Sequence, residues 1–208
     1  EINQINNIVN EDCSAKISAM IMFNQFDEAK IVKKTSDIAL DTIRLTFKKE
    51  EISHAFDFAK KIKDFGYELF LNPKDIHTYS LNEIQKLTLK VNEIVPFAFS
   101  IVDTKGVLDE KRLILIYDTI ESELNSEIEL CFHSHNTMGN SFQNAKKLLE
   151  MNKKRNLILD STIFGIGKGA GNLNTKMIFQ YLNKDLTAIE HIDKCEFVLK
   201  NVYDIVKA

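Results

Sequence analysis

The sequence contains few cysteines, no long apolar run and no large excess of charge of either sign. Its 3 cysteines, Cys13, Cys131 and Cys195, are an odd number without close spacing, so a disulfide framework is not expected. No apolar run is long enough to span a bilayer, and the sequence gives no reason to expect a signal peptide. A formal net charge of -3 gives no electrostatic reason to expect nucleic acid. These absences favour a cytoplasmic protein with neither membrane nor nucleic acid as a partner.

Two common catalytic signals are also missing. No lysine stands in a setting that predicts a Schiff base, and no serine-nucleophile motif is present. The chain begins at Glu1, in a polar stretch and without an initiating methionine. We therefore expect further residues upstream. With 208 residues, 44% of them hydrophobic, the default expectation is a single domain over residues 1–208.

Strand-like and helix-like apolar patterns alternate along the chain. Six strands are predicted, at residues 16–23, 41–47, 67–71, 96–102, 127–135 and 156–163. Helices are predicted at residues 27–39, 51–65, 80–93, 109–124, 141–151, 174–182 and 187–206. Helices between strands imply parallel pairing through right-handed crossovers, as in an open doubly wound sheet or a TIM (β/α)8-type barrel. Six units are two fewer than a closed barrel has, and they would be its strands 3–8 with a final C-terminal helix.

Two histidines stand at the end of the predicted strand 127–135. A strand places residues i and i+2 on the same face, so His133 and His135 are predicted to point the same way, with Cys131 beside them. Two imidazoles on one face supply half of a metal site, and a hard divalent ion still requires a carboxylate. The alternative is a polar, hydrogen-bonded pair at a strand exit. For Cys131, a small buried side chain is favoured over a metal ligand.

Four of the chain's 7 glycines lie between Gly165 and Asn172. Backbone amides at a helix start could hold a phosphate there, with Lys168 adding positive charge. Alternatively, the glycines allow a tight turn that brings Asn172 near a metal, or form only a flexible turn before a helix. The stretch is not a Walker A loop, because Gly-Lys is not followed by Ser or Thr. It follows the last strand rather than the first, which also disfavours a dinucleotide-binding fingerprint.

Polar residues recur at the carboxyl ends of the predicted strands, where barrel enzymes place their active sites. Arg44 and Thr46 lie on the polar face of the alternating strand 41–47, and Asp103-Thr104 end the strand 96–102. Turn chemistry alone would explain Asp103-Thr104, but a hydroxyl there could also orient a substrate carboxylate. We therefore include Arg44 and Thr104 as catalytic candidates.

Two strings of the sequence, FHSHNTMGNSFQNA (residues 132–145) and DSTIFGIGKGAGN (residues 160–172), resemble the last two strands of a known family. This family is the DRE-TIM metallolyases, also called HMG-CoA lyase-like proteins. The segments KISAMIMF and SIVDTKG, and the strand around Arg44, resemble the family's third, sixth and fourth strands. The resemblance extends to about residue 183 and points to the branch that contains 4-hydroxy-2-oxovalerate aldolase.

The resemblance implies a TIM barrel that makes or breaks a carbon–carbon bond next to the carbonyl of a 2-oxo acid. It implies that His133 and His135 are metal ligands, that Asn172 is a ligand or lies close to the metal, and that Thr104 and Asn136 bind substrate. The ion would be Mn²⁺ or Mg²⁺, or Zn²⁺ in some members, acting as a Lewis acid. The expected partners are a small-molecule 2-oxo acid and either a second copy in a homodimer or a downstream dehydrogenase.

The sequence also departs from the family pattern. The family's first strand carries an Arg-Asp pair, in which the aspartate is a metal ligand and the arginine stabilises the enolate, and no such strand is found here. Thr175-Lys176 stand where many members have a glutamate. We expect the missing ligand in upstream residues. Two alternatives stay open: an acyl-CoA-dependent 2-oxo acid synthase, like isopropylmalate or homocitrate synthase, and a catalytically inactive fragment or scaffold.

Overall fold

Six parallel strands form one sheet in the computed structural model, which describes residues 5–6, 14–182 and 186–207. Each strand pairs with its neighbour in sequence, so the spatial order equals the chain order. The strands are β1 (Ile17–Met22), β2 (Leu40–Phe47), β3 (Glu68–Pro73), β4 (Ala98–Asp103), β5 (Glu129–Ser134) and β6 (Leu157–Leu159).

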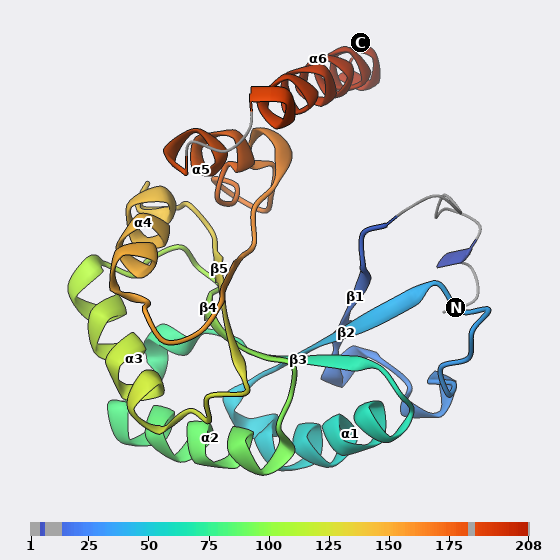
Figure 1. Cartoon of the computed structure of the whole chain (residues 1–208), viewed down its shortest axis with the longest axis vertical. Helices are drawn as coiled ribbons and strands as arrows, with labels where there is room; N and C mark the ends of the chain where they lie inside the picture. The colour runs from blue at the N-terminus through green and yellow to red at the C-terminus, as the bar shows by residue number, and fades with distance from the viewer. Residues whose placement is uncertain (1–4, 7–13, 183–185, 208) are drawn as a thin grey trace.

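The α-helices follow β2 and every later strand. They are α1 (Ile52–Asp64), α2 (Leu81–Ile94), α3 (Glu110–Glu123), α4 (Ser141–Met151), α5 (Thr175–Tyr181) and α6 (Leu186–Lys207). Short 3-10 turns complete the chain: η2 (Phe23–Gln25), η3 (Glu28–Lys30), η4 (Lys49–Glu51), η5 (Ile76–Thr78) and η6 (Ile163–Gly165). Figure 1 shows α1 to α4 in an arc outside the curved sheet, with α5 and α6 beyond its β6 side.

The strand order and the helix positions decide between the two predicted architectures. A doubly wound sheet has helices on both faces and a reversal of strand order, whereas a barrel has sequential strands with helices outside. The sequential order and the outer arc of helices therefore confirm the barrel-type prediction. Within the described residues β1 and β6 are the two ends of the sheet, so the six strands form an open, partial barrel.

The convex face of the sheet, which the helices cover, carries the hydrophobic core. On β2 this face presents Ile43, Leu45 and Phe47, which are at most 1% exposed and pack in one cluster with α1 residues such as Ala59 and Ile62. The alternation predicted for this strand is confirmed, because Thr42, Arg44 and Thr46 take the concave face. Apolar side chains pack under the helices, and polar side chains are left for the barrel interior.

The helix predicted at residues 27–39 is wrong. The chain there forms only η3 and then irregular structure before β2. Two of its apolar residues, Ile31 and Ile38, are buried, and their i, i+7 spacing is one that a helix would also give. The backbone nitrogen of Lys34 donates to the carbonyl of Phe65 at 2.8 Å, beyond the end of α1. Tertiary hydrogen bonds and the burial of two separated side chains therefore fix this connection in place of a helix.

The other predicted elements are confirmed with shifted ends. Ser80 opens α2 as a capping box with Glu83, as expected from the sequence. The strand predicted at 156–163 is shorter in the structure. Its pairing with β5 covers Leu157–Leu159, and the last hydrogen bond between the two segments runs from the Asp160 nitrogen to the Phe132 carbonyl. The helix predicted at 187–206 begins at Leu186, which places Thr187 inside the helix and not at its N-cap.

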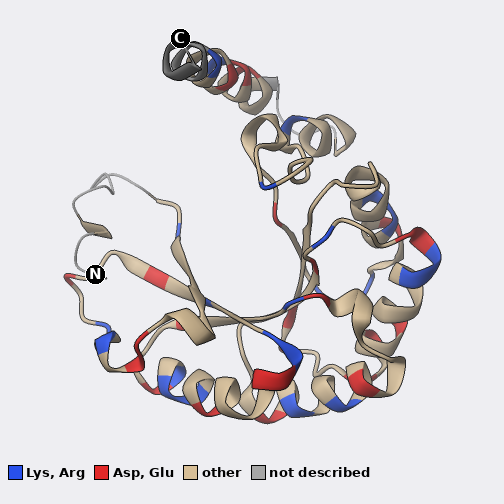
Figure 2. Ribbon diagram, turned by 180° about the vertical axis from the view of Figure 1, so that it is seen from behind, with Lys and Arg blue, Asp and Glu red and all other residues tan. Residues whose placement is uncertain are grey.

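Charged residues occur along all the outer helices (Figure 2). Figure 2 shows acidic and basic residues interspersed along the outer helices. Among the residues with a described structure, no helix combines the length and the apolar character that crossing a membrane requires.

Candidate functional site

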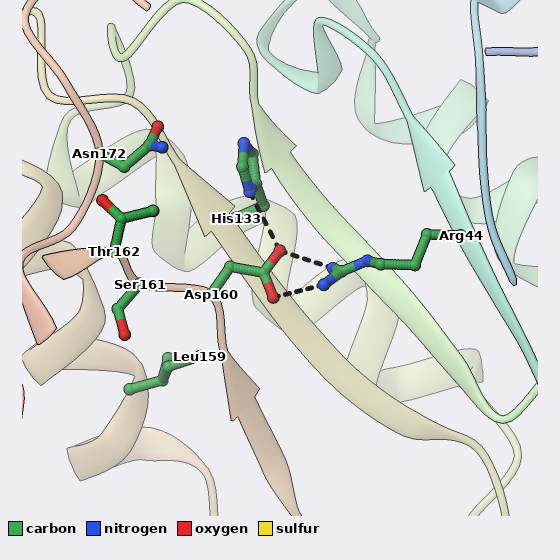
Figure 3. A pocket seen from close by; sticks show the side chains of 7 residues that line it. All are labelled: Arg44, His133, Leu159, Asp160, Ser161, Thr162 and Asn172. Carbon is green, nitrogen blue, oxygen red and sulfur yellow. Dashed lines mark hydrogen bonds and ion pairs between the residues drawn. The ribbon is translucent and has the colours of Figure 1, made fainter. Parts of the chain in front are cut away.

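The carboxyl ends of β5 and β6 border a cavity of about 360 Å³. Its walls come from three separate parts of the chain: the concave face of β2, the ends of β5 and β6, and the glycine-rich loop that follows β6. The lining residues, drawn in Figure 3, are Arg44, His133, Leu159, Asp160, Ser161, Thr162 and Asn172.

The two histidines lie together at this end of β5, as predicted. Their ring centroids are 5.4 Å apart, with the ring planes at 77°. Nδ1 of His133 lies 3.0 Å from Oδ2 of Asp160, and Nδ1 of His135 lies 3.3 Å from the backbone oxygen of Lys168. The strand periodicity thus identified which way both rings point, and the tertiary structure supplies the partner of each ring.

Asp160 is the central residue of the site, and its role was not predicted from the sequence. Figure 3 shows it between His133 and Arg44, with one carboxylate in contact with both. Burial raises the pKa of this carboxyl, but hydrogen bonds from His133 and Arg44 outweigh burial and hold the pKa below its usual value. The position of a carboxylate directly after an apolar strand was a usable signal, of the same kind that singled out Asp103.

Arg44 reaches Asp160 from β2 across the concave face. Its Nη1 donates to Oδ1 at 2.7 Å and its Nη2 to Oδ2 at 2.5 Å, and its guanidinium lies 4.7 Å from the centroid of the Phe70 ring. Burial lowers the pKa of Arg44, but the interactions with Asp160 outweigh it and raise the pKa. The predicted candidate therefore lines the cavity with its charge balanced by a bidentate carboxylate partner.

Cys131 lies on the same face as His133 but is fully buried. Its Sγ accepts from Nη2 of Arg44 at 3.3 Å and lies 3.6 Å from Oδ1 of Asp160. Burial, with the Asp160 charge as a second cause, raises the pKa of this thiol to about 12. A protonated, buried thiol fits the packing role favoured from the sequence.

The glycine-rich loop joins the end of β5. His135 and Asn172 form an isolated antiparallel bridge, and the Asn136 nitrogen donates to the Gly171 carbonyl at 2.9 Å. A Cβ at Gly167 would lie 2.5 Å from Nδ2 of Asn172, so a larger residue there would displace the Asn172 side chain from its present position. The two sequence motifs thus form one site. This geometry favours the interpretation in which the glycines position Asn172.

Among the described residues, the side-chain amide of Asn172 has a hydrogen-bond partner at one of its two polar atoms only. Its Nδ2 donates to the Ile166 carbonyl at 3.1 Å, whereas its Oδ1 is buried and, within the described part of the chain, has no hydrogen-bond partner. A buried acceptor without a partner costs about 1–3 kcal/mol, so such an atom calls for a ligand or another explanation.

Three predicted residues, His135, Thr104 and Asn136, lie outside the lining of the cavity. The Thr104 hydroxyl oxygen accepts from the Asp75 nitrogen at 2.8 Å, which fastens the loop after β4 to the loop after β3. Oδ1 of Asn136 accepts from the nitrogen and the hydroxyl of Ser141 at 3.2 and 2.8 Å, at the start of α4. Asp103 accepts from the nitrogens of the next loop, at Val107 and Leu108, both at 3.0 Å. The contacts of Asp103 agree with the turn chemistry that the sequence left open, whereas the tertiary contacts of Thr104 and Asn136 were not predicted.

The donor atoms of the site fit a divalent metal in part. His133 and His135 supply imidazole nitrogens, and Asn172 supplies the buried amide oxygen that has no partner. Among residues 5–6, 14–182 and 186–207, however, no group of three or more His, Cys, Asp or Glu side chains is placed to hold a metal ion. Asp160 does not complete the set, because its oxygens bind His133 and Arg44.

A sequential parallel sheet with outer helices and a histidine pair at its carboxyl end defines an α/β protein of the TIM-barrel type. The chain matches the sequence model of the HMGL-like family over residues 7–199 and belongs to that family, the DRE-TIM metallolyases. A 72-residue segment is 38% identical to 4-hydroxy-2-oxovalerate aldolase from Pseudoalteromonas translucida (strain TAC 125). That segment covers 35% of this chain and about one fifth (20%) of the relative.

Solved structures share the fold. The N-terminal domain of a candidate aldolase from Bacteroides vulgatus matches with a TM-score of 0.76 and 21% identity, over 97% of this chain and 69% of that one. HMG-CoA lyase from Brucella melitensis matches with a TM-score of 0.73 and 12% identity, over 96% and 78%. The carboxyl transferase domain of Rhizobium etli pyruvate carboxylase, solved with pyruvate and biocytin, matches with a TM-score of 0.62 and 13% identity, over 76% and 28%.

Proposed function

We propose that this chain forms most of the active site of a divalent-metal-dependent aldolase or lyase, which makes or breaks a carbon–carbon bond on a 2-oxo acid. The observation that carries the proposal is the convergence of His133, His135 and Asn172 through the bridge between the end of β5 and the glycine-rich loop. Membership of the HMGL-like family and the partial match to 4-hydroxy-2-oxovalerate aldolase support the same chemistry.

His133, His135 and Asn172 would hold the metal. A mixed nitrogen and oxygen set suits Mn²⁺ or Zn²⁺ better than Mg²⁺, which prefers oxygen ligands, although all three ions fit the family. When bound, a divalent ion supplies a Lewis acid that polarises the carbonyl of the 2-oxo acid. A further carboxylate ligand, which the described residues lack, is part of the proposal.

The chain's own residues shape and charge the cavity. At about 360 Å³ its size suits a small molecule rather than a macromolecule. Arg44 is neutralised by Asp160, so the proposal gives it no direct contact with the substrate carboxylate. Thr104 and Asn136 stay predicted substrate residues, and the proposal does not depend on them. A homodimer or a dehydrogenase partner likewise stays a prediction.

Metal binding is the first test of this proposal. Mn²⁺ titrations followed by electron paramagnetic resonance should show binding, and His133→Gln or His135→Gln should weaken it at least as much as the roughly 10–100-fold typical of outer-shell changes. His54→Gln is the matched control, because His54 is exposed on α1, far along the chain from the site. Equal Mn²⁺ affinity in all four proteins would remove the metal site from the proposal.

The reaction is the second test. Exchange of pyruvate methyl protons for deuterium, followed by proton NMR, should require Mn²⁺ and should fail in His133→Gln. Consumption of acetyl-CoA with a 2-oxo acid would instead favour the synthase alternative. Tight Mn²⁺ binding with neither reaction would favour an inactive scaffold over the aldolase.

A further inference from the structure

Both imidazoles of the site face atoms that can only accept a hydrogen bond. Nδ1 of His133 meets a carboxylate oxygen of Asp160, and Nδ1 of His135 meets the backbone carbonyl of Lys168. Neither partner has a hydrogen to give, so the proton of each contact must be on Nδ1. A neutral imidazole carries one N–H, and Nε2 of each ring is therefore the nitrogen with the free lone pair.

The partner of His133 is itself held in place. The Asp160 carboxylate accepts from Nη1 and Nη2 of Arg44 at 2.7 and 2.5 Å, one bond to each oxygen. The guanidinium in turn lies over the Phe70 ring, 4.7 Å from its centroid. The side chains of Arg44 and Asp160 are 19% and 18% exposed. This arrangement keeps the carboxylate ionised and stops it from turning away from His133 (Figure 3).

We propose that Asp160 is a positioning residue that fixes His133 in the Nδ1–H tautomer, and that Arg44 acts only through Asp160. The use of the resulting Nε2 lone pair as a metal ligand rests on the proposed function. Metal-binding histidines commonly donate their second ring nitrogen to a carboxylate or a backbone carbonyl, and this site contains one of each. His135 has the same tautomer for a different reason, since its partner belongs to the backbone of the glycine-rich loop.

Two variants distinguish the effect of Asp160 on His133 from the effect of Arg44, which holds Asp160 in place. Arg44→Met removes the guanidinium that orients Asp160 but leaves its carboxylate near His133, whereas Arg44→Met/Asp160→Leu removes both charges and leaves no buried arginine unpaired. Histidine ring ¹H–¹⁵N correlation spectra without metal, at a pH where the rings are neutral, report which nitrogen carries the proton. Loss of signals in His133→Gln and His135→Gln assigns the two rings.

The Nδ1–H form of His133 should stay the major form in Arg44→Met, with a smaller Nε2–H population from carboxylates that have turned away. In the double variant the Nε2–H population should be clearly larger. His135 is the internal control and should keep its tautomer in every variant. An unchanged His133 tautomer in the double variant would overturn the inference. A parallel change at His135 would overturn it too, because it would show that Asp160 supports the fold and not one ring.

Metal affinity provides a second readout. The Mn²⁺ dissociation constant should rise only part of the way in Arg44→Met and should rise roughly 10–100-fold in the double variant. Equal Mn²⁺ affinity of the two variants, despite a changed His133 tautomer, would mean that the tautomer does not serve metal binding. If the unmodified protein bound no Mn²⁺, the proposed function would fail, while the metal-free spectra would still decide the role of Asp160.

Discussion

The two faces of the sheet are built from the same strands but serve different purposes. The convex face of β2 carries Ile43 and Leu45, both fully buried under the helices. The concave face of the same strand carries Arg44, which pairs with Asp160 across the barrel interior. Alternate residues of one strand therefore face either the core or the site. Substitutions on the convex face should mainly lower the free energy of unfolding, and substitutions on the concave face should mainly alter the site.

The largest expected difference is between two phenylalanines on neighbouring strands. Phe99 on β4 is fully buried in the convex core, and its replacement by alanine should lower the free energy of unfolding by about 3–5 kcal/mol. Phe70 on β3 is also buried but lies on the concave face against Arg44 and Phe97, so Phe70→Ala should cost only roughly 2 kcal/mol. Urea unfolding measures both, and an equal loss would contradict the assignment of stability to the convex face.

The second effect belongs to the ion pair of the concave face. Asp160→Ala leaves the mostly buried Arg44 without its partner and should lower the free energy of unfolding by about 3 kcal/mol. Arg44→Met/Asp160→Leu removes both charges and should stay within about 1 kcal/mol of the unmodified protein. Urea unfolding of the two variants, analysed as a pair, tests this. A larger loss in the double variant would show that the pair contributes to stability itself.

A smaller effect, of opposite sign, is expected from two threonines on one strand. Oγ1 of Thr46 is buried and lacks a partner in the described part of the chain, so Thr46→Val should leave stability unchanged or raise it by up to about 1 kcal/mol. Thr42 lies on the same face of β2, and its hydroxyl donates to Glu68 at 3.4 Å. Thr42→Val should therefore lower stability by about 0.5 kcal/mol. A clear loss in Thr46→Val would indicate an unseen partner for its hydroxyl, and thermal unfolding is a sufficient measurement.

The smallest expected effect concerns Cys131, whose thiol should not react with thiol reagents in the native protein. Because burial raises the pKa of Cys131 to about 12, its thiol stays protonated as the pH rises and forms thiolate only near pH 12. In Cys13→Ser/Cys195→Ser, a thiol reagent at about pH 8 should label the protein only after unfolding. The matched variant that retains the exposed Cys195 should react in the native state. Rapid native labelling of Cys131 would show that the concave face opens to solvent.

Much of the fold could be predicted because it depends on local periodicity. The alternation of β2 and the apolar stripes of α1 and α3 follow from which residues avoid water, and neighbouring residues suffice to show it. The segment at residues 27–39 shows where this fails. Its structure depends on a hydrogen bond from Lys34 to Phe65 and on burial of Ile31 and Ile38, neither of which is a local signal.

The site divides in the same way. Local sequence suffices to predict that His133 and His135 point in one direction, since residues two apart in a strand share a face, and that the glycine-rich loop is a candidate part of the site. The position of Asp160 between His133 and Arg44 follows only from the folded arrangement, because Asp160 and Arg44 are 116 residues apart in the chain. The same holds for the contacts of Thr104 and Asn136 with a loop and a helix start. Partners brought together by parallel crossovers share no spacing in the sequence, because the curvature of the sheet, and not the local period, sets which strand ends meet.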